Sequence, residues 1–159
     1  MAVHQHSPGR KTRVFLVDDE AIVRRGLRLL FGSKPDLAVC GEAATEHDAL
    51  EGILARRPDL AVVDLSLKEG DGLALITQLH RLCPGLKILV FSMHAQVHFA
   101  TVAFEAGAHG YVVKEEGTER VLEAIQTLMK GGCYLSAGLA AEAPSLKSRV
   151  KPRPKQRSP

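Results

Sequence analysis

The sequence contains no apolar stretch of 18 residues, so no segment is long and hydrophobic enough to cross a bilayer as a helix. The first eleven residues, MAVHQHSPGRK, are polar and lack the apolar segment of a secretory signal peptide. We therefore expect a cytoplasmic protein without membrane contact, in which residues 1–11 form a flexible tail.

Cysteine pairs and nucleotide-binding motifs are also lacking. The three cysteines, Cys40, Cys83 and Cys133, are an odd number at wide spacing, with no CxxC pair and no cysteine–histidine cluster. This pattern argues against a disulfide framework and a zinc site, and it fits thiols that stay reduced. The chain has no GxxxxGKS/T loop and no GxGxxG after its first apolar run, so nothing supports a nucleotide cofactor.

Acidic residues are missing from the C-terminal end. Between Ser145 and Pro159 the chain has six basic residues, three prolines and no acidic residue. The whole sequence has 21 lysines and arginines against 18 acidic residues, so the part before this end is mildly acidic. Charge that alternates with proline, without an apolar period, indicates an extended linker. We expect residues 136–159 to be a basic, disordered linker or tail and residues 12–135 to be the folded domain.

The sequence does contain short apolar runs that each end in a polar side chain. The runs VFLVDD, LAVVDL, KILVFS and GYVVK end at Asp18 and Asp19, at Asp64, at Ser92 and at Lys114. Runs rich in Val, Ile, Leu and Phe are typical of buried parallel strands. Ligands bind at the carboxyl ends of the strands in an open α/β sheet. Three carboxylates, a hydroxyl and an ammonium at one edge suit a divalent cation together with a phosphoryl group.

These runs alternate with helical periodicity along the folded part of the chain. We expect strands at about 13–17, 37–42, 60–64, 87–91 and 110–113, and helices at about 21–31, 45–57, 72–82, 96–105 and 118–130. Thr45 followed three residues later by Asp48 is typical of a capped helix start. Five βα units predict an α/β fold, a doubly wound sheet of five parallel strands with helices on both faces.

With these strand ends in place, residues 12–135 resemble the receiver domain of two-component response regulators. The resemblance is carried by VDDE, VVDLSL, FSMH and AGAHGYVVKE, which follow or surround the first, third, fourth and fifth expected strands. The order of all four motifs makes the match specific. The GGCYLS segment is similar to the end of receivers that carry a C-terminal helix-turn-helix (LuxR-type) output domain. The resemblance implies a flavodoxin-like fold with strand order 2-1-3-4-5.

The resemblance also implies a role for the acidic residues. Asp64 would be the phosphoacceptor, because a carboxylate can act as a nucleophile toward a phosphoryl group. Mg²⁺ would be the cofactor, held by Asp19, Asp64 and the backbone carbonyl of Ser66, with Asp18 partly through water. Two carboxylates about 5 Å apart repel by about 3 kcal/mol at an effective dielectric of 20, and a divalent cation relieves that conflict.

The remaining strand ends would act on the phosphoryl group and on a switch. Lys114 would pair with one phosphoryl oxygen, and Ser92 would donate a hydrogen bond to another. Tyr111 matches the switch aromatic of the family, which can move into the space left behind when the phosphoryl group draws Ser92 inward. The surface formed by the expected helices 96–105 and 118–130 and the strand between them would then change shape. We interpret His94, two residues after Ser92, as an exposed loop residue.

Two positions depart from the family pattern. Many receivers have proline four residues after the phosphoacceptor, where this chain has Lys68, and proline after the active-site lysine, where it has Glu115. These departures affect the expected loop geometry and leave the chemical residues in place.

Two alternative functions stay open. Aspartate-nucleophile, Mg²⁺-dependent phosphohydrolases combine the same groups, but their DxDxT/V signature follows the first strand, and the sequence after Asp64 lacks a second aspartate. The third possibility is an interaction module that works without phosphorylation, and Mg²⁺-dependent labelling of Asp64 would distinguish it from a receiver.

The function implied is a phosphorylation-dependent signalling receiver and not an enzyme with a separate substrate. Its phosphodonor would be a sensor histidine kinase, and it would form a homodimer when phosphorylated. It would control transcription and contact DNA only through an output domain, for which the 28 residues after Gly131 are too few and too polar. The chain would then be either a stand-alone receiver or a piece of a longer regulator, and its linker-like last residues favour the second.

Overall fold

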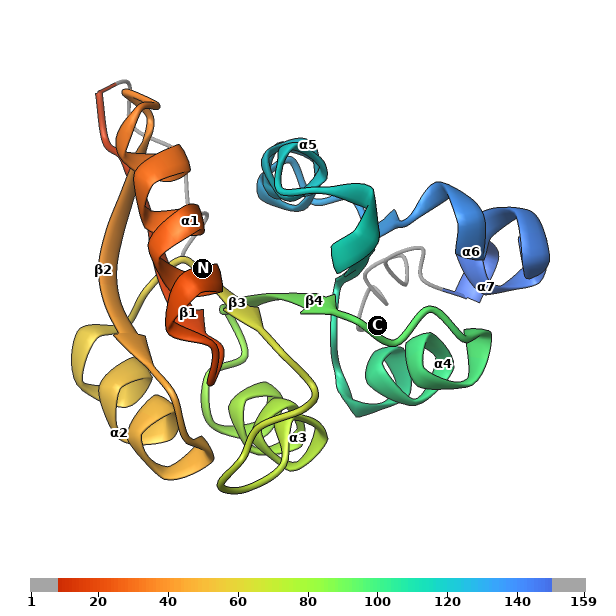
Figure 1. The fold of residues 1–159 in the computed structure, drawn as a ribbon, viewed down its shortest axis with the longest axis horizontal. Coiled ribbons are helices and arrows are strands. Elements are labelled where there is room, and N and C mark those ends of the chain that lie inside the picture. The colour runs from red at the N-terminus through yellow and green to blue at the C-terminus, as the bar shows by residue number, and fades with distance from the viewer. Residues whose placement is uncertain (1–8, 150–159) are drawn as a thin grey trace, which may run out of the picture.

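The computed structural model describes residues 9–149, which form a single parallel sheet between two layers of helices (Figure 1). The strands are β1 (Thr12–Val17), β2 (Leu37–Ala43), β3 (Leu60–Val63), β4 (Lys87–Ser92), β5 (Gly110–Val113) and β6 (Tyr134–Leu135). The helices are α1 (Ala21–Gly32), α2 (Glu46–Arg56), α3 (Gly72–Leu82), α4 (Val97–Ala106), α5 (Glu119–Met129), α6 (Ala137–Glu142) and α7 (Pro144–Arg149), and a short 3₁₀ turn, η1, spans Lys114–Glu116.

The sheet has the strand order β2-β1-β3-β4-β5-β6, and every neighbouring pair is parallel. The α/β class, the parallel arrangement and the order of the first five strands are therefore confirmed. The expected number of five strands is wrong, because β6 adds a sixth at the edge, where Tyr111 pairs with Leu135. Two residues are too short a run for an alternation of polar and apolar residues to be visible in the sequence.

Helices cover both faces of the sheet, and each layer encloses its own buried cluster. Figure 1 shows α1 and α5 on one side and α2, α3 and α4 on the other. The α1–α5 side buries Leu27 and Phe31 of α1 with Ile125 and Leu128 of α5. The opposite side buries apolar residues of α2, α3 and α4. The chain begins α2 as predicted, since the Thr45 hydroxyl accepts a hydrogen bond from the Asp48 amide at 3.1 Å.

The C-terminal segment is folded where the sequence predicted disorder, so that prediction is wrong for residues 136–149. Leu139 of α6 and Leu146 of α7 are 2% and 4% exposed. Both belong to the same buried apolar cluster as residues of α4. The helices α6 and α7 lie beside α4 in Figure 1. The segment folds because a few leucines are buried against the domain. The basic and proline-rich composition of the last residues hid this in the sequence. The rest of the expected linker, 150–159, and residues 1–8 of the expected tail lie outside the described residues.

Within residues 9–149, no helix combines the length and the apolar character that crossing a bilayer requires.

The buried position of Leu139 gives a stability prediction. Leu139→Ala should lower the free energy of unfolding by about 2 kcal/mol, because it removes buried methyl groups and leaves a cavity. For a domain near this size, the melting temperature should fall by roughly 6 °C. Thermal unfolding followed by circular dichroism checks this, with Ala141→Ser at an exposed position of the same helix as control. Equal melting temperatures for the two variants would show that α6 adds no stability to the domain.

Candidate functional site

The polar residues identified in the sequence meet at the carboxyl edge of the sheet. Asp18 follows β1, Asp64 follows β3, Ser92 ends β4 and Lys114 follows β5. The strand register makes these ends level, since Val17 pairs with Val63, and Ser92 pairs with Val113. Apolar strand residues therefore carry four chemically active side chains to one place.

The Lys114 ammonium is the centre of this group. Its Nζ lies 2.8 Å from Asp18 Oδ2, 2.9 Å from Asp64 Oδ2 and 3.2 Å from Glu20 Oε1. The Lys114 side chain is 7% exposed, and those of Asp18 and Asp64 are each 5% exposed. Ion pairs in such a desolvated place are screened little by salt or water.

The pKa values of Asp18 and Lys114 are both raised, but for different reasons. Desolvation raises the pKa of Asp18 above its ordinary value, although the hydrogen bond from Lys114 works against it. Burial alone would lower the pKa of Lys114, but its hydrogen bonds and charge interactions with Asp18 and Asp64 outweigh burial and raise it. Lys114 is therefore a firmly charged ammonium at neutral pH.

The oxygen atoms around Lys114 form a set that a hard cation could use. Carboxylate oxygens of Asp18, Asp19, Glu20 and Asp64 all lie within 4.8 Å of one another. Four carboxylates against one ammonium leave an excess of negative charge, and oxygen donors of this kind are those that Mg²⁺ prefers. The donor set thus fits a divalent cation. Glu20 was not among the predicted site residues, because it follows the acidic pair without a strand end to mark it. Its contact with Lys114 spans 94 residues of sequence, and its side chain is 52% exposed.

The loops after β1 and β3 hold the two buried carboxylates by backbone hydrogen bonds. Asp18 Oδ1 accepts a hydrogen bond from the Glu20 amide at 2.8 Å, and Asp64 Oδ1 accepts one from the Ser66 amide at 3.2 Å. The chain passes closely behind Asp64, where a Cβ on Gly72 would clash with the backbone of Asp64 and Leu65. The predicted metal contact through the Ser66 carbonyl stays a prediction.

The expected switch residues lie beside the carboxylates. Ser92 and Tyr111 are completely buried, and the Tyr111 hydroxyl donates a 2.6 Å hydrogen bond to the backbone carbonyl of His94. Burial, together with the nearby Asp64 charge, raises the pKa of Tyr111 to about 12, although Ser92 works against that shift. Tyr111 thus occupies the inside of the domain.

His94 lies in the loop between β4 and α4, as expected, but the interpretation of it as exposed is wrong. Its ring is half-buried, and its Nε2 lies 2.8 Å from the Ser66 hydroxyl. The contact joins two loops 28 residues apart in sequence, so no local pattern could predict it.

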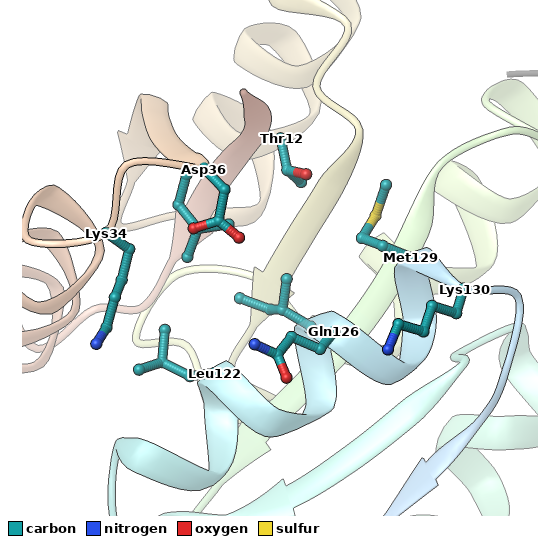
Figure 2. A pocket seen from close by; sticks show the side chains of 9 residues that line it. Thr12, Lys34, Asp36, Leu122, Gln126, Met129 and Lys130 are labelled. Carbon is teal, nitrogen blue, oxygen red and sulfur yellow. The ribbon is translucent and has the colours of Figure 1, made fainter. Parts of the chain in front are cut away.

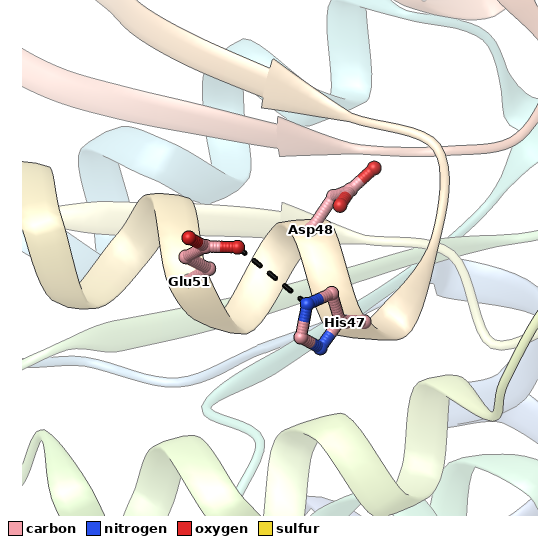
Figure 3. A group of neighbouring side chains, drawn as sticks. All are labelled: His47, Asp48 and Glu51. Atoms are coloured by element: carbon pink, nitrogen blue, oxygen red, sulfur yellow. Dashed lines mark ion pairs between the residues drawn. The ribbon is translucent and has the colours of Figure 1, made fainter.

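A second group of possible metal ligands lies away from this edge. His47, Asp48 and Glu51 stand on the outer surface of α2, where His47 and Glu51 approach to 3.5 Å (Figure 3). The side chains of this pair are 86% and 75% exposed, as is common for a solvated ion pair one helical turn apart. Such an exposed ion pair contributes little to the stability of the fold, and its geometry needs no bound metal ion to explain it.

A pocket of about 520 Å³ lies at the other end of the sheet (Figure 2). It is bordered by Thr12 and Leu37 at the starts of β1 and β2, and by Lys34 and Lys130 near its rim. Because these strand starts lie opposite the strand ends, the pocket is separate from the carboxylate group.

Comparison with known proteins gives one consistent family. A family model described as the response regulator receiver domain matches residues 14–126. The chain is 38% identical over 129 residues to the DNA-binding transcriptional activator DevR/DosR of Mycobacterium tuberculosis, covering 81% of this chain and 59% of that protein. It is 34% identical over 129 residues to the transcriptional regulatory protein UhpA of Salmonella typhimurium, covering 81% and 64%. The chain thus spans about three-fifths of the length of these relatives.

A solved structure agrees with the sequence comparisons. The crystal structure of a two-component response regulator of the LuxR family from Aurantimonas sp. SI85-9A1 matches with a TM-score of 0.81 at 36% identity. The match covers 88% of this chain and 99% of that structure.

The buried ion pairs of Lys114 give a prediction that concerns charge. Lys114→Met should lower the free energy of unfolding at pH 7 by about 3 kcal/mol in the presence of a chelator, because it leaves buried carboxylates without their partner. Lys130→Met, at an exposed lysine, is the control and should change little. Denaturant unfolding of the two variants measures the difference.

The pH dependence follows from the raised pKa of Lys114. The folded state holds the proton more tightly than the unfolded state, so the stabilisation is fully present below the ordinary lysine value of 10.5. It is lost as the pH rises above 10.5 toward the folded-state pKa. The gap between wild type and Lys114→Met should therefore narrow at alkaline pH, and a gap that stays constant would contradict the ion-pair explanation.

Proposed function

This chain belongs to the response regulator receiver domains, as its motifs predicted, and from that membership we propose that it is a phosphorylation-dependent signalling receiver with Asp64 as phosphoacceptor. The observation that carries the proposal is the arrangement around Asp64. Its carboxylate is buried beside Asp18 and bound by Lys114, at the edge where strand ends of a parallel sheet meet.

The reaction proposed is transfer of a phosphoryl group from a phosphohistidine of a sensor histidine kinase in the cytoplasm. An oxygen of Asp64 forms a bond to phosphorus, the phosphorus–nitrogen bond of the donor breaks, and the electron pair stays with the histidine ring. The product is an acyl phosphate on Asp64. Lys114 already lies 2.9 Å from an Asp64 oxygen, so its ammonium is placed to pair with an oxygen of the new group. The chain is then the acceptor and catalyses its own phosphorylation and dephosphorylation, without a separate substrate.

Mg²⁺ is the cofactor proposed for this site. When bound, it supplies positive charge that neutralises the phosphoryl oxygens during transfer. Asp18, Asp19 and Asp64 would hold it, since their oxygens lie within one cluster. Lys114 is bound to oxygens of two of these residues, so its ammonium and the cation share the same negative charge.

The output proposed is a change in the surface formed by α4, β5 and α5. Ser92 would turn toward the phosphoryl group, and Tyr111 and the loop before α4 would adjust with it. This change would favour a homodimer and control transcription, as expected of a relative of transcriptional regulators. Any contact with DNA would be made by an output domain of the kind that LuxR-type regulators carry, and not by the receiver itself.

Phosphoryl labelling tests the acceptor. Incubation with acetyl phosphate and Mg²⁺ should add one phosphoryl group to the wild type, detected by intact-mass spectrometry. Asp64→Asn should add none, because an amide is a poor nucleophile and cannot form the acyl phosphate. Asp48→Asn, at the exposed group on α2, is the matched control and should label like the wild type. Equal labelling of the Asp64 variant would reject Asp64, and no labelling of any chain would favour an interaction module that needs no phosphorylation.

Metal titration tests the cation site. Asp19→Ala should weaken Mg²⁺ binding by about tenfold, equivalent to about 1.4 kcal/mol, because it removes a charged ligand. Amide chemical shifts in nuclear magnetic resonance report the affinity without requiring any activity. Asp48→Ala is again the control, and the same affinity in both variants would show that Asp19 only flanks the start of α1.

A further inference from the structure

His94 contacts four separate parts of the domain. Its ring Nε2 lies 2.8 Å from the hydroxyl of Ser66 in the acceptor loop, and its ring stacks on Phe99 of α4 with centroids 4.0 Å apart. Its amide donates to the Ser92 hydroxyl at 3.2 Å, and its carbonyl accepts from the Tyr111 hydroxyl at 2.6 Å. One loop residue therefore touches the acceptor loop, the end of β4, the switch aromatic and α4.

We propose that His94 is a positioning residue that couples the acceptor loop to α4 and holds Tyr111 inside the domain. The proposal rests on the proposed function, since it explains how a change at Asp64 would reach the output surface. Asp64 binds the amide of Ser66, and Ser66 binds the ring of His94. A new group on Asp64 would shift this short chain of contacts at its first member.

The ring matters because the neighbouring loop side chains, those of Met93, Ala95 and Gln96, point to solvent and do not anchor the loop. Met93 is 59% exposed, and Ala95 and Gln96 are exposed. Gln96 stands at the start of α4 and makes no capping hydrogen bond with its side chain. Among residues 93–96, the ring of His94 therefore supplies the side-chain contacts of the loop, one with Ser66 and one with Phe99, in addition to the backbone hydrogen bonds of His94.

The backbone contacts of His94 carry the loop position to Tyr111. The buried phenol needs an acceptor for its hydroxyl, and a buried hydroxyl without a partner is costly. The carbonyl of His94 is such an acceptor, so a loop that moves away removes this 2.6 Å hydrogen bond from Tyr111. Tyr111 should then populate positions outside the domain more often.

Tyrosine fluorescence can follow this movement in the unphosphorylated protein. The chain has two tyrosines and no tryptophan, so a Tyr134→Phe background makes Tyr111 the one emitting side chain of its kind. In that background, His94→Ala should raise the ratio of outward to inward Tyr111 about fivefold, equivalent to about 1 kcal/mol for a lost hydrogen bond. Iodide quenching of tyrosine emission measures the ratio.

Two further variants separate the ring contacts from a general loss of folding. Ser66→Ala removes the hydrogen bond and keeps the stacked ring, so it should raise quenching by less than His94→Ala. His47→Ala, on the exposed surface of α2, should leave quenching unchanged. Quenching equal to that of the background for both His94→Ala and Ser66→Ala would overturn the proposal. Should His94→Ala lose its fold by circular dichroism, Ser66→Ala decides alone.

The coupling itself is tested with phosphodonor. After acetyl phosphate and Mg²⁺, the amide shifts of α4 should change in the wild type and change much less in His94→Ala, while both chains carry label on Asp64. Full α4 shifts in labelled His94→Ala would overturn the coupling role. If neither the wild type nor His94→Ala takes up label, the proposed function is rejected. The quenching experiment would still test whether His94 holds Tyr111 inside the domain.

Discussion

The sheet of this domain brings buried carboxylates of like charge to one edge, and a single ammonium holds them there. Asp18 and Asp64 follow neighbouring parallel strands, so their separation is set by the strand spacing and cannot relax. Both carboxylates are buried, so water screens their repulsion little. The ammonium of Lys114, which is bound to both and to Glu20, compensates this repulsion. Any added cation or phosphoryl group must change the balance of charge around Lys114, and therefore where its side chain points.

Strand β5 connects this charge balance to the rest of the domain. Lys114 follows β5 directly, and Tyr111 lies within it. The far side of the same strand is bound to the C-terminal segment, because the Val113 amide donates to the Ser136 hydroxyl at 2.8 Å and the Ser136 amide donates to the Tyr111 carbonyl at 2.9 Å. A shift of β5 would therefore displace the segments bonded to both of its edges, which are the loop before α4 and the segment that begins α6.

The sequence predicted those parts that follow from local patterns. Apolar runs located the five main strands, and the polar residues after them located the carboxylates and Lys114, since parallel topology makes strand ends meet. Residue composition was a poor guide to the C-terminal segment, where Leu135, Leu139 and Leu146 are buried within a stretch poor in other large apolar residues. The places of Glu20 and His94 depend on contacts with distant loops, such as the one between His94 and Ser66, which no spacing in the sequence encodes.

The departures from the family's prolines have a structural counterpart. Lys114 reaches both buried carboxylates with Glu115 as its neighbour, so proline is not needed after the lysine to place the ammonium. The turn η1 that follows is acidic, and the Glu116 carboxylate accepts a 3.4 Å hydrogen bond from the amide of Gly138 in α6. The loop after β5 therefore contacts the C-terminal segment directly through a side chain. In this chain, the turn that begins with Lys114 is bonded to α6, so a movement of Lys114 can be transmitted to the C-terminal helices through Glu116.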